Sequence, residues 1–294
     1  MEKAVCHLPG LFEFYDFYRK FLPIYREKTE YFYDWCQIGS LYGAPADCLW
    51  AGGRVSTGNA DPRQVLALTE EYGLSARLTF SNSLLRPEHL KDPKCNRLCA
   101  LFGAEPGNGV IVHSELLLDY LKEKYPNFYF VSSTTKVLTD FEDLAAETER
   151  PDFRYVVPDF RLNKAFDRLA GLREKRKVEF LCNECCWPGC RERKECYENV
   201  SRKNLGEHCP DHICAAPEGE KGYRFSAAMK NPAFIGIRDI RETYLPMGFS
   251  QFKIEGRGLG SAMLLEFILY YLTKPEYQLP LREEMYLDSM LDLF

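Results

Sequence analysis

The sequence lacks the features that mark nucleic-acid binders, membrane proteins and secreted proteins. Its 38 Lys and Arg stand against 43 Asp and Glu, and this balance argues against a dedicated nucleic-acid binder or a polybasic membrane anchor. No apolar run reaches the ~18 residues that span a bilayer, because the best candidate, 259–272, carries Glu266 in its middle. The first residues show no apolar core before a cleavage site. We therefore expect a cytoplasmic protein without a membrane span.

The common hydrolase and nucleotide-binding motifs are also absent. The sequence contains no H-E-x-x-H, no G-x-S-x-G and no P-loop, so neither zinc proteolysis nor serine hydrolysis has a motif to support it. Apolar residues make up 46% of the 294 residues, which is typical of a globular protein with a full core. Any function must therefore be sought in the order of the elements and in unusual clusters of residues.

Short β-type runs alternate with longer amphipathic stretches along most of the chain. The helical stretches include 62–72, which ends before Gly73, and 115–125, which has acid at its start and Lys near its end. The runs predicted as strands are Asp34–Gly39, Ala76–Ser81, Val110–Ser114, Phe128–Ser133, Arg154–Pro158, Val178–Cys182, Phe234–Arg238 and Gln251–Glu255. Eight strands with intervening helices predict an α/β protein with a (β/α)8 TIM-like barrel; an open doubly wound sheet is the alternative.

The predicted organisation has three parts. Residues 1–33 are expected to form an N-terminal helical cap, 34–274 the TIM-like barrel, and 275–294 a C-terminal tail with one short helix. Within the barrel, 183–233 is a long cysteine-rich loop after the sixth predicted strand. Loops of this length inside a compact domain are usually functional or disordered, and its cysteine density argues against disorder. In a barrel it would leave the end where active sites lie.

Seven of the twelve cysteines fall between Cys182 and Cys214. Cys186 and Cys190 flank a Pro-Gly turn, and further cysteines stand on both sides of this pair. In a reducing compartment such a cluster favours a metal site, either an iron–sulfur cluster or tetrahedral zinc, and spacing alone does not decide between them. Alternatively, Cys182 is a buried strand residue and Cys196 a bystander. Cys95 and Cys99, apart from the cluster, are interpreted as residues of one helix face.

Several segments resemble the collagenase-like U-type peptidase family. VEFLCNECCWPGCRERKECYENVS is similar to the family's sixth-strand motif, although Cys196 stands where many relatives have His; the matching residues are Asn183, Cys186, Cys190, Arg193, Tyr197 and Ser201. FIGIRDIRETYLPMGFSQFKIEGRG is similar to the closing segment, with matches at Arg238, Lys253, Glu255, Gly256 and Arg257. Weaker matches are Tyr42, Gly43, Arg54 and Asn82.

The resemblance implies a TIM-like barrel with its site at the carboxyl ends of the strands. Several relatives, including those in oxygen-independent ubiquinone and RNA hydroxylation, carry a four-iron–four-sulfur cluster on four cysteines. We therefore expect an iron–sulfur cluster in preference to zinc. Its predicted ligands are Cys186 and Cys190 with two more from Cys48, Cys182, Cys185, Cys209 and Cys214, Cys48 being included because some relatives take one ligand from the first-strand loop.

The predicted catalytic residues are polar groups at the strand ends. Arg257 could bind a carboxylate or phosphate through two hydrogen bonds, and Glu255 could act as acid or base; the alternative is a structural ion pair between them. Arg238 and Asn183 complete the predicted catalytic set. Arg54, Asn82 and Arg193 are predicted to contribute to cofactor binding.

Three functions follow from these predictions. The first is an iron–sulfur enzyme that catalyses a hydroxylation or another redox or modification reaction on a small molecule, an RNA or a peptide. The second is a non-catalytic binding module whose long loop is stapled by zinc. The third is a peptidase of unrecognised mechanism. A partner protein of the same family is also expected.

Overall fold

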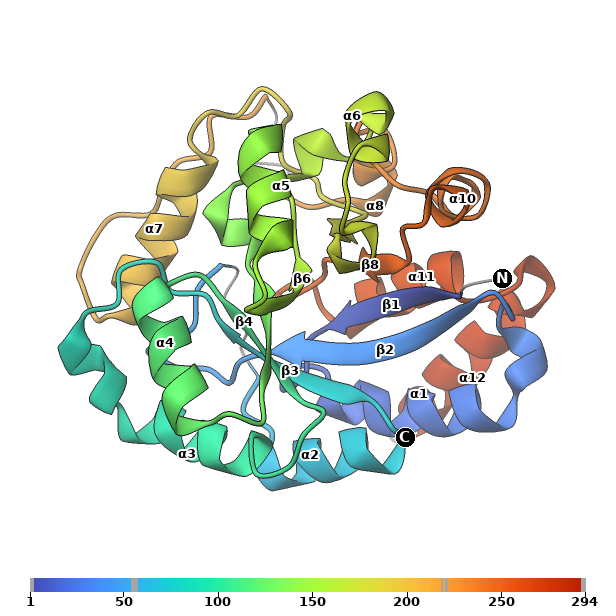
Figure 1. Cartoon of the computed structure of the whole chain (residues 1–294). Coiled ribbons are helices and arrows are strands. Elements are labelled where there is room, and N and C mark those ends of the chain that lie inside the picture. Colours follow the sequence, from blue (N-terminus) through green and yellow to red (C-terminus); the bar gives the residue numbers. More distant parts are fainter. Residues whose placement is uncertain (1–2, 54–57, 218, 220–221, 292–294) are drawn as a thin grey trace.

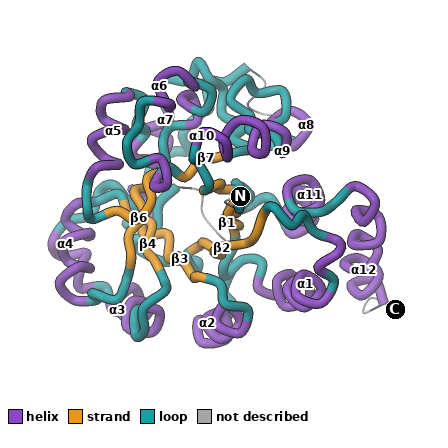
Figure 2. Tube along the Cα trace, turned by 45° about the vertical axis from the view of Figure 1, so that its right-hand side comes forward, coloured by secondary structure: helices purple, strands orange, loops and turns teal. Residues whose placement is uncertain are grey.

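Eight parallel strands form a nearly closed (β/α)8 barrel, as the sequence predicts (Figures 1 and 2). The structure is a computed structural model that describes residues 3–53, 58–217, 219 and 222–291. The strands are β1 (Ala4–Pro9), β2 (Cys36–Gly43), β3 (Ser75–Phe80), β4 (Gly109–Val112), β5 (Tyr129–Ser132), β6 (Phe153–Val156), β7 (Glu179–Leu181) and β8 (Gln251–Lys253). Their order is β6-β5-β4-β3-β2-β1-β8-β7, and a single bridge between Val156 and Val178 joins the two ends.

Helices surround the ring of strands, and Figure 2 shows them on its outer side. The α-helices are α1 (Tyr15–Glu27), α2 (Pro62–Glu71), α3 (Pro93–Phe102), α4 (Glu115–Lys124), α5 (Phe141–Glu149), α6 (Phe166–Ala170), α7 (Arg193–Asn204), α8 (Phe225–Ala228), α9 (Ile237–Asp239), α10 (Leu245–Met247), α11 (Ser261–Tyr271) and α12 (Gln278–Leu291). Short 3-10 helices are η1 (Thr29–Tyr31), η2 (Pro87–Lys91), η3 (Thr134–Lys136), η4 (Phe160–Leu162), η5 (Lys175–Lys177) and η8 (Pro275–Tyr277), and η7 (Ile240–Tyr244) is a π-helical turn. None of the described helices is long and apolar enough to cross a membrane.

One strand of the barrel was not predicted, and one predicted strand is not a strand. The predicted number of strands is therefore still eight. The predicted N-terminal helical cap contains β1, which pairs with both β2 and β8 and therefore belongs to the barrel. The predicted strand Phe234–Arg238 is a turn into α9, because the Asp239 carboxylate accepts a hydrogen bond from the Gly236 amide and caps the helix start. The cysteine-rich segment thus follows the seventh strand, β7, and the connection to β8 runs on to residue 250.

Apolar side chains fill both the outer shell and the middle of the barrel. The outer shell packs the helices against the strands, and all four residues of β4 are buried. Inside the barrel, five buried side chains form a separate cluster: Tyr42, Ile111, Val131, Val157 and Leu181. This cluster divides the interior into two polar regions, one toward the amino ends of the strands and one toward their carboxyl ends. Active sites of such barrels lie at the carboxyl ends.

Helix α7 brings part of the cysteine-rich connection back over the barrel. Its residues Arg193, Tyr197 and Ser201 are four apart and therefore share one face. Arg193 and Ser201 are the buried residues of the helix, and α7 contacts the η3 turn after β5. The three motif residues that the sequence singled out are therefore those that anchor α7 to the carboxyl end of the barrel.

Candidate active site at the carboxyl ends of the strands

A polar pocket opens at the carboxyl end of the barrel, and we call it the mouth pocket. It is narrow: a water-sized molecule finds about 20 Å³ of free space in it, within a mouth of about 410 Å³ that includes open solvent. It is lined by Tyr42, Gly53, Thr79, Ser81, Ile111, Ser133, Thr134, Thr135, Tyr197, Lys253, Glu255 and Arg257. Tyr42 and Ile111 belong to the apolar cluster inside the barrel, so the pocket rests on that cluster. Hydroxyl groups dominate one wall and charged groups another.

The charged wall comes from the end of β8. Lys253 is the last residue of the strand, and Glu255 and Arg257 follow at alternate positions. Since side chains of an extended chain alternate between its two faces, all three point toward the same side. The guanidinium of Arg257 donates to Thr79 Oγ1 at 3.1 Å, which holds it across the pocket against β3. The predicted residues Glu255 and Arg257 are therefore brought together in one pocket.

Glu255 is held in place by the predicted residue Asn183. The Asn183 Oδ1 atom accepts from the Glu255 amide at 2.7 Å, and its Nδ2 donates to the Glu255 carbonyl at 3.1 Å. Both side chains are buried. Asn183 does not line the mouth pocket itself; it clamps the backbone after β7 to the backbone after β8. These hydrogen bonds position Glu255. The structure therefore favours a supporting role for Asn183, which the sequence prediction placed in the catalytic set.

Lys253 is a site residue that the sequence analysis matched to the family but did not assign a role. Its Nζ lies 3.6 Å from the ring centroid of Tyr42 and 3.5 Å from Glu179 Oε1. Its side chain is 5% exposed and still lines the pocket. Burial lowers the pKa of the Lys253 ammonium to about 8, with Arg77 and Arg257 adding to the shift and Glu179 opposing it. An inward-facing Lys at a barrel strand end was the signal that could have found it.

A second polar region lies on the other side of Lys253, toward the amino ends of the strands. We call it the lower network, and we call the polar groups of the mouth pocket the upper region. Arg77 donates to Glu179 Oε2 at 2.5 Å and to the Tyr129 hydroxyl at 2.8 Å. His7 shares hydrogen bonds with Ser40 and Gln251. Burial alone would raise the pKa of Glu179, but Arg77, His7 and Lys253 lower it to about 2. Burial lowers the pKa of His7 to about 3, so the imidazole is neutral at physiological pH.

The hydroxyl wall of the pocket contains a short hydrogen-bonded chain. His113 Nδ1 lies 2.9 Å from Thr135 Oγ1, which donates to Ser133 Oγ at 2.9 Å. Burial lowers the pKa of His113 to about 4, with Lys136 and Lys194 adding to the shift. The chain therefore presents neutral donors and acceptors to the pocket. The sequence prediction missed these residues because each is an ordinary strand-end residue until its neighbours are known.

Two predicted site residues lie elsewhere, and a third cannot be placed. Arg238 is on α9 with a side chain 86% exposed, where its Nε pairs with Glu242 Oε2 at 2.7 Å. It does not line the mouth pocket, so its predicted place in the catalytic set finds no support in the geometry of that pocket. Its segment is the turn into α9, not a strand that would point it inward. Arg54 lies outside the described residues. Asn82 is fully buried and its Nδ2 donates to the carbonyls of Leu49 and Ser201, which makes it a clamp for loops.

Arg193 anchors the cysteine-rich connection. Its guanidinium pairs with Glu184 Oε2 at 2.8 Å and with Asp159 Oδ2 at 3.4 Å. It also lies over the rings of Phe160 and Tyr197. Although burial alone would lower its pKa, Tyr197 and the carboxylates of Glu184 and Asp159 raise it. These contacts hold Arg193 against the protein, although its Nε and Nη1 have no hydrogen-bond partner among the described groups. Arg193 does not line the mouth pocket, and its predicted part in cofactor binding stays a prediction.

The seven cysteines predicted as candidate metal ligands do not form a group of three or more that could hold a metal ion among the described residues. Cys182 is fully buried and its thiol donates to the Phe180 carbonyl, whereas Cys214 is exposed. Cys209 lies beside Asn199. Among the described residues, which include all twelve cysteines, no group of three or more His, Cys, Asp or Glu side chains is arranged to hold a metal ion. This arrangement does not fit a cluster or zinc ion held by four of the predicted ligands.

Cys48 instead lies against two cysteines of α3. Its Sγ is 3.1 Å from Cys95 Sγ, and Cys99 is buried on the same face of that helix. The hydrogen bond with Cys48 and burial raise the pKa of Cys95, and burial raises that of Cys99. The prediction that Cys95 and Cys99 share a helix face is confirmed. Raised pKa values keep these thiols protonated and unreactive at physiological pH.

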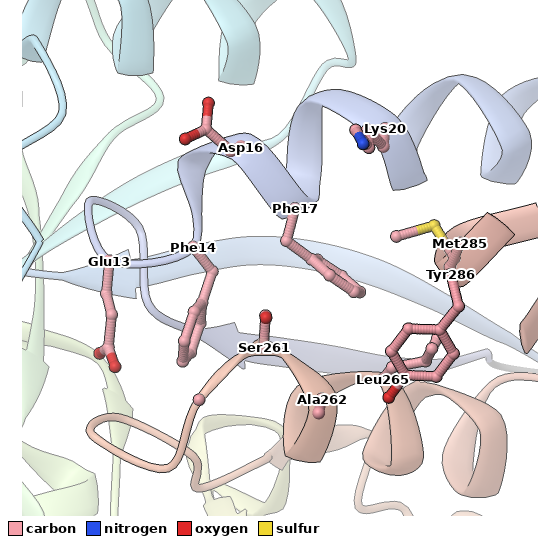
Figure 3. Close-up of a pocket in the computed structure, with 11 residues that line it drawn as sticks. Glu13, Phe14, Asp16, Phe17, Lys20, Ser261, Ala262, Leu265, Met285 and Tyr286 are labelled. Carbon is pink, nitrogen blue, oxygen red and sulfur yellow. The ribbon is translucent and has the colours of Figure 1, made fainter. Parts of the chain in front are cut away.

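A groove on the outside of the barrel is larger than the mouth pocket but chemically simpler. Figure 3 shows it between α1, α11 and α12, with Phe14 and Phe17 facing Leu265 and Met285. Glu13 lies at one end, where its carboxylate accepts hydrogen bonds from the Gly258 amide. The groove joins helices, and the charged residues that line it, Glu13, Asp16 and Lys20, are not buried. We therefore place the candidate active site in the mouth pocket.

Comparisons with known proteins found a solved structure with a similar fold, but no matching family model or curated protein. No family model and no curated protein matches the sequence. Among solved structures, the U32 peptidase Mk0906 matches with a TM-score of 0.54 and 14% identity, over 86% of this chain and 92% of that chain. At this level of identity the likeness shows a shared fold. It supports the part of the sequence resemblance that concerns the U-type peptidase fold.

Proposed function

We propose that the chain is an enzyme whose active site is the mouth pocket and whose substrate carries a carboxylate or phosphate group. The observation that carries this proposal is the convergence of Glu255 and Arg257 on one pocket, beside the buried Lys253. A planar guanidinium binds such an anion through two parallel hydrogen bonds. A carboxyl group next to it can transfer a proton to or from the bound substrate.

The state of Arg257 supports binding of an anion. Its Nε is buried and has no hydrogen-bond partner among the described groups, while another nitrogen of the same guanidinium donates to Thr79. A buried donor without a partner costs about 1–3 kcal/mol. A substrate oxygen would supply the missing acceptor. Arg257 is therefore the binding residue and Glu255 the proton-transfer residue, held by Asn183.

Titration calorimetry with malonate and with inorganic phosphate at low ionic strength tests the binding residue. We expect the wild-type protein to bind one of them saturably, and Arg257→Gln to bind it at least about tenfold more weakly, since a charge-assisted hydrogen bond is worth that much. Arg238→Gln is the matched control, because it removes a fully exposed arginine. Equal binding by wild type and Arg257→Gln would contradict the proposal.

Peptide hydrolysis is a second candidate function, favoured by the fold that the chain shares with the U32 peptidase Mk0906. In this case Arg257 would hold a carboxylate of the peptide and Glu255 would activate water. Incubation with unfolded casein, followed by mass spectrometry of the fragments, tests it. We expect cleavage by the wild type and its loss in Glu255→Gln. An intact casein chain after prolonged incubation with the wild type would exclude this function.

The iron–sulfur cluster, and with it hydroxylation or another redox reaction, stays a prediction from the sequence resemblance. Because the predicted ligands do not gather, we derive no catalytic step through a cluster. Anaerobic purification with iron, sulfide and zinc analysis tests the prediction, repeated on Cys190→Ala and on the control Cys196→Ala. Stoichiometric iron and sulfide that fall only in Cys190→Ala would support it. Zinc in their place would support the zinc-stapled module, and the absence of all three would leave the mouth pocket as the functional centre.

A further inference from the structure

We propose that Lys253 is a covalent nucleophile that forms an imine with a 2-oxo acid substrate in the mouth pocket. The inference rests on the proposed function, because it uses Arg257 as the binding residue, and it names the substrate class and the residue that reacts. Three observations carry it: the place of Lys253 in the barrel, the ring that it shares with Arg257, and the groups that surround its ammonium.

The amine of Lys253 is almost completely buried, and yet it borders the mouth pocket. It ends β8, its side chain is 5% exposed, and it still lines the mouth pocket. A surface lysine is charged and solvated, and its amine does not attack carbonyl groups readily. A lysine that is desolvated and close to other cations has a larger neutral fraction, which is the property that amine nucleophiles require. Arg77 and Arg257 supply the neighbouring cations here.

Lys253 and Arg257 both lie near the ring of Tyr42. Lys253 Nζ is 3.6 Å from the ring centroid, and Arg257 Cζ is 5.8 Å from the same centroid. The Tyr42 hydroxyl donates to the Ile254 carbonyl at 2.6 Å, which fixes the ring. Because Lys253 and Arg257 line the same pocket, a carboxylate bound to Arg257 would bring the carbonyl carbon attached to it toward the Lys253 amine. A neutral aldehyde would lack this second point of attachment.

The buried carboxylates around Lys253 allow the proton transfers that imine formation needs. The neutral amine attacks the carbonyl carbon, a C–N bond forms, and the carbonyl oxygen takes a proton from Glu255 to give a carbinolamine. The ionised Glu255 then takes a proton from the nitrogen and passes it to the carbinolamine hydroxyl, the C–O bond breaks as the C=N bond forms, and one water leaves a cationic imine. No electron is gained or lost overall. Glu179, 3.5 Å from Nζ, stabilises the cationic imine once it has formed.

Reductive trapping tests the inference without knowledge of the natural reaction. The full chain is incubated with glyoxylate and sodium cyanoborohydride, and the modified lysines are located by peptide mass spectrometry. We expect a carboxymethyl group on Lys253 at least about tenfold faster than on the exposed Lys91, and about tenfold slower trapping in Arg257→Gln. The rate should rise with pH up to about 8, where the amine loses its proton.

Variants and a second probe separate this inference from the proposed function. Lys253→Arg keeps the charge beside Glu179 and should abolish trapping, and Lys253→Met should do the same; Lys91→Met is the control, and thermal unfolding verifies that each variant folds. Trapping of the wild type on surface lysines alone would overturn the inference even if malonate binds through Arg257. Equal trapping of glyoxylate and acetaldehyde on Lys253, unchanged by Arg257→Gln, would overturn the 2-oxo acid assignment together with the role of Arg257.

Discussion

The two polar regions inside the barrel are made of similar side chains but differ in how their charges are satisfied. Toward the amino ends, His7, Arg77 and Glu179 are fully buried and bonded to one another or to neighbouring polar groups. Toward the carboxyl ends, Glu255 and Arg257 border a pocket, and Arg257 keeps a donor without a partner among the described groups. A network whose charged groups are all hydrogen-bonded stabilises a fold, whereas a charged group with an unpaired donor beside a pocket is available for a ligand.

Lys253 stands between these two regions and belongs to both. Its ammonium approaches Glu179 of the lower network and lines the pocket of the upper one. The difference between the regions teaches that burial alone does not identify an active site. His7 and Arg77 also line a pocket, at the amino ends of the strands. What distinguishes the region at the carboxyl ends is Arg257, whose buried Nε has no hydrogen-bond partner among the described groups. The following predictions test this comparison, from the largest expected effect to the smallest.

Breaking the lower network should cost the most stability. Arg77→Met leaves Glu179 buried with its closest cation removed, and we expect the free energy of unfolding to fall by about 3–5 kcal/mol. Denaturant titration at neutral pH measures it. The double variant Arg77→Met/Glu179→Leu should recover part of this loss, because it leaves no carboxylate unpaired. A single variant as stable as the wild type would show that the network is not closed.

Removing the clamp between the two strand ends should have an intermediate effect on stability and a second effect on binding. Asn183→Ala leaves the buried amide and carbonyl of Glu255 without their partner, which costs about 1–3 kcal/mol. We also expect weaker binding of the anion that the wild type binds, since Glu255 and Arg257 share one short segment. A loss of stability with unchanged anion binding would separate the clamp from the site.

Acid should destabilise the lower network through His7. The folded state keeps His7 neutral because its pKa is about 3, whereas the unfolded chain takes up a proton below about pH 6.5. Stability is therefore lost as the pH falls from about 6.5, by about 1.4 kcal/mol for each pH unit. His7→Gln should show a flatter dependence of unfolding free energy on pH between about 6.5 and 5. Parallel curves for the two proteins would contradict a neutral buried His7.

The smallest effect is expected outside both regions. Arg238→Gln removes an exposed ion pair with Glu242, and exposed pairs contribute little because water and salt screen them. Stability and anion binding should both match the wild type. A clear loss of anion binding in this variant would show that Arg238 contributes to the binding site, contrary to its position outside the mouth pocket.

The amount of the site that could be predicted depended on how its residues are connected. Glu255 and Arg257 were found because they match the closing segment of the family that the sequence resembles and stand at the end of one predicted strand, so they are close along the chain. The hydroxyl wall comes from separate strands, and its residues carry no pattern in the sequence. Arg238 was misplaced because its segment was interpreted as a strand, and the capping residue Asp239 starts a helix there instead.

The cysteines show the opposite case. Cys186 and Cys190 are close in sequence, yet the predicted set does not converge, whereas Cys48 and Cys95 are far apart in sequence and touch. Short spacing limits how far apart two thiols can be but does not decide where either points. The position of α3 against the loop after β2 decides which thiols meet. That position depends on how these distant segments pack together.

By itself the sequence determined the alternation of strands and helices, because the apolar periodicity of each element is a local property of the chain. It also placed Glu255 and Arg257 together at the end of one predicted strand. Only the tertiary structure decided that β1 closes the barrel, that Lys253 lies between the network and the pocket, and that the described cysteines predicted as ligands form no group of three that could hold a metal. These features depend on which distant segments pack together, and the free energy of that packing is shared over the whole barrel.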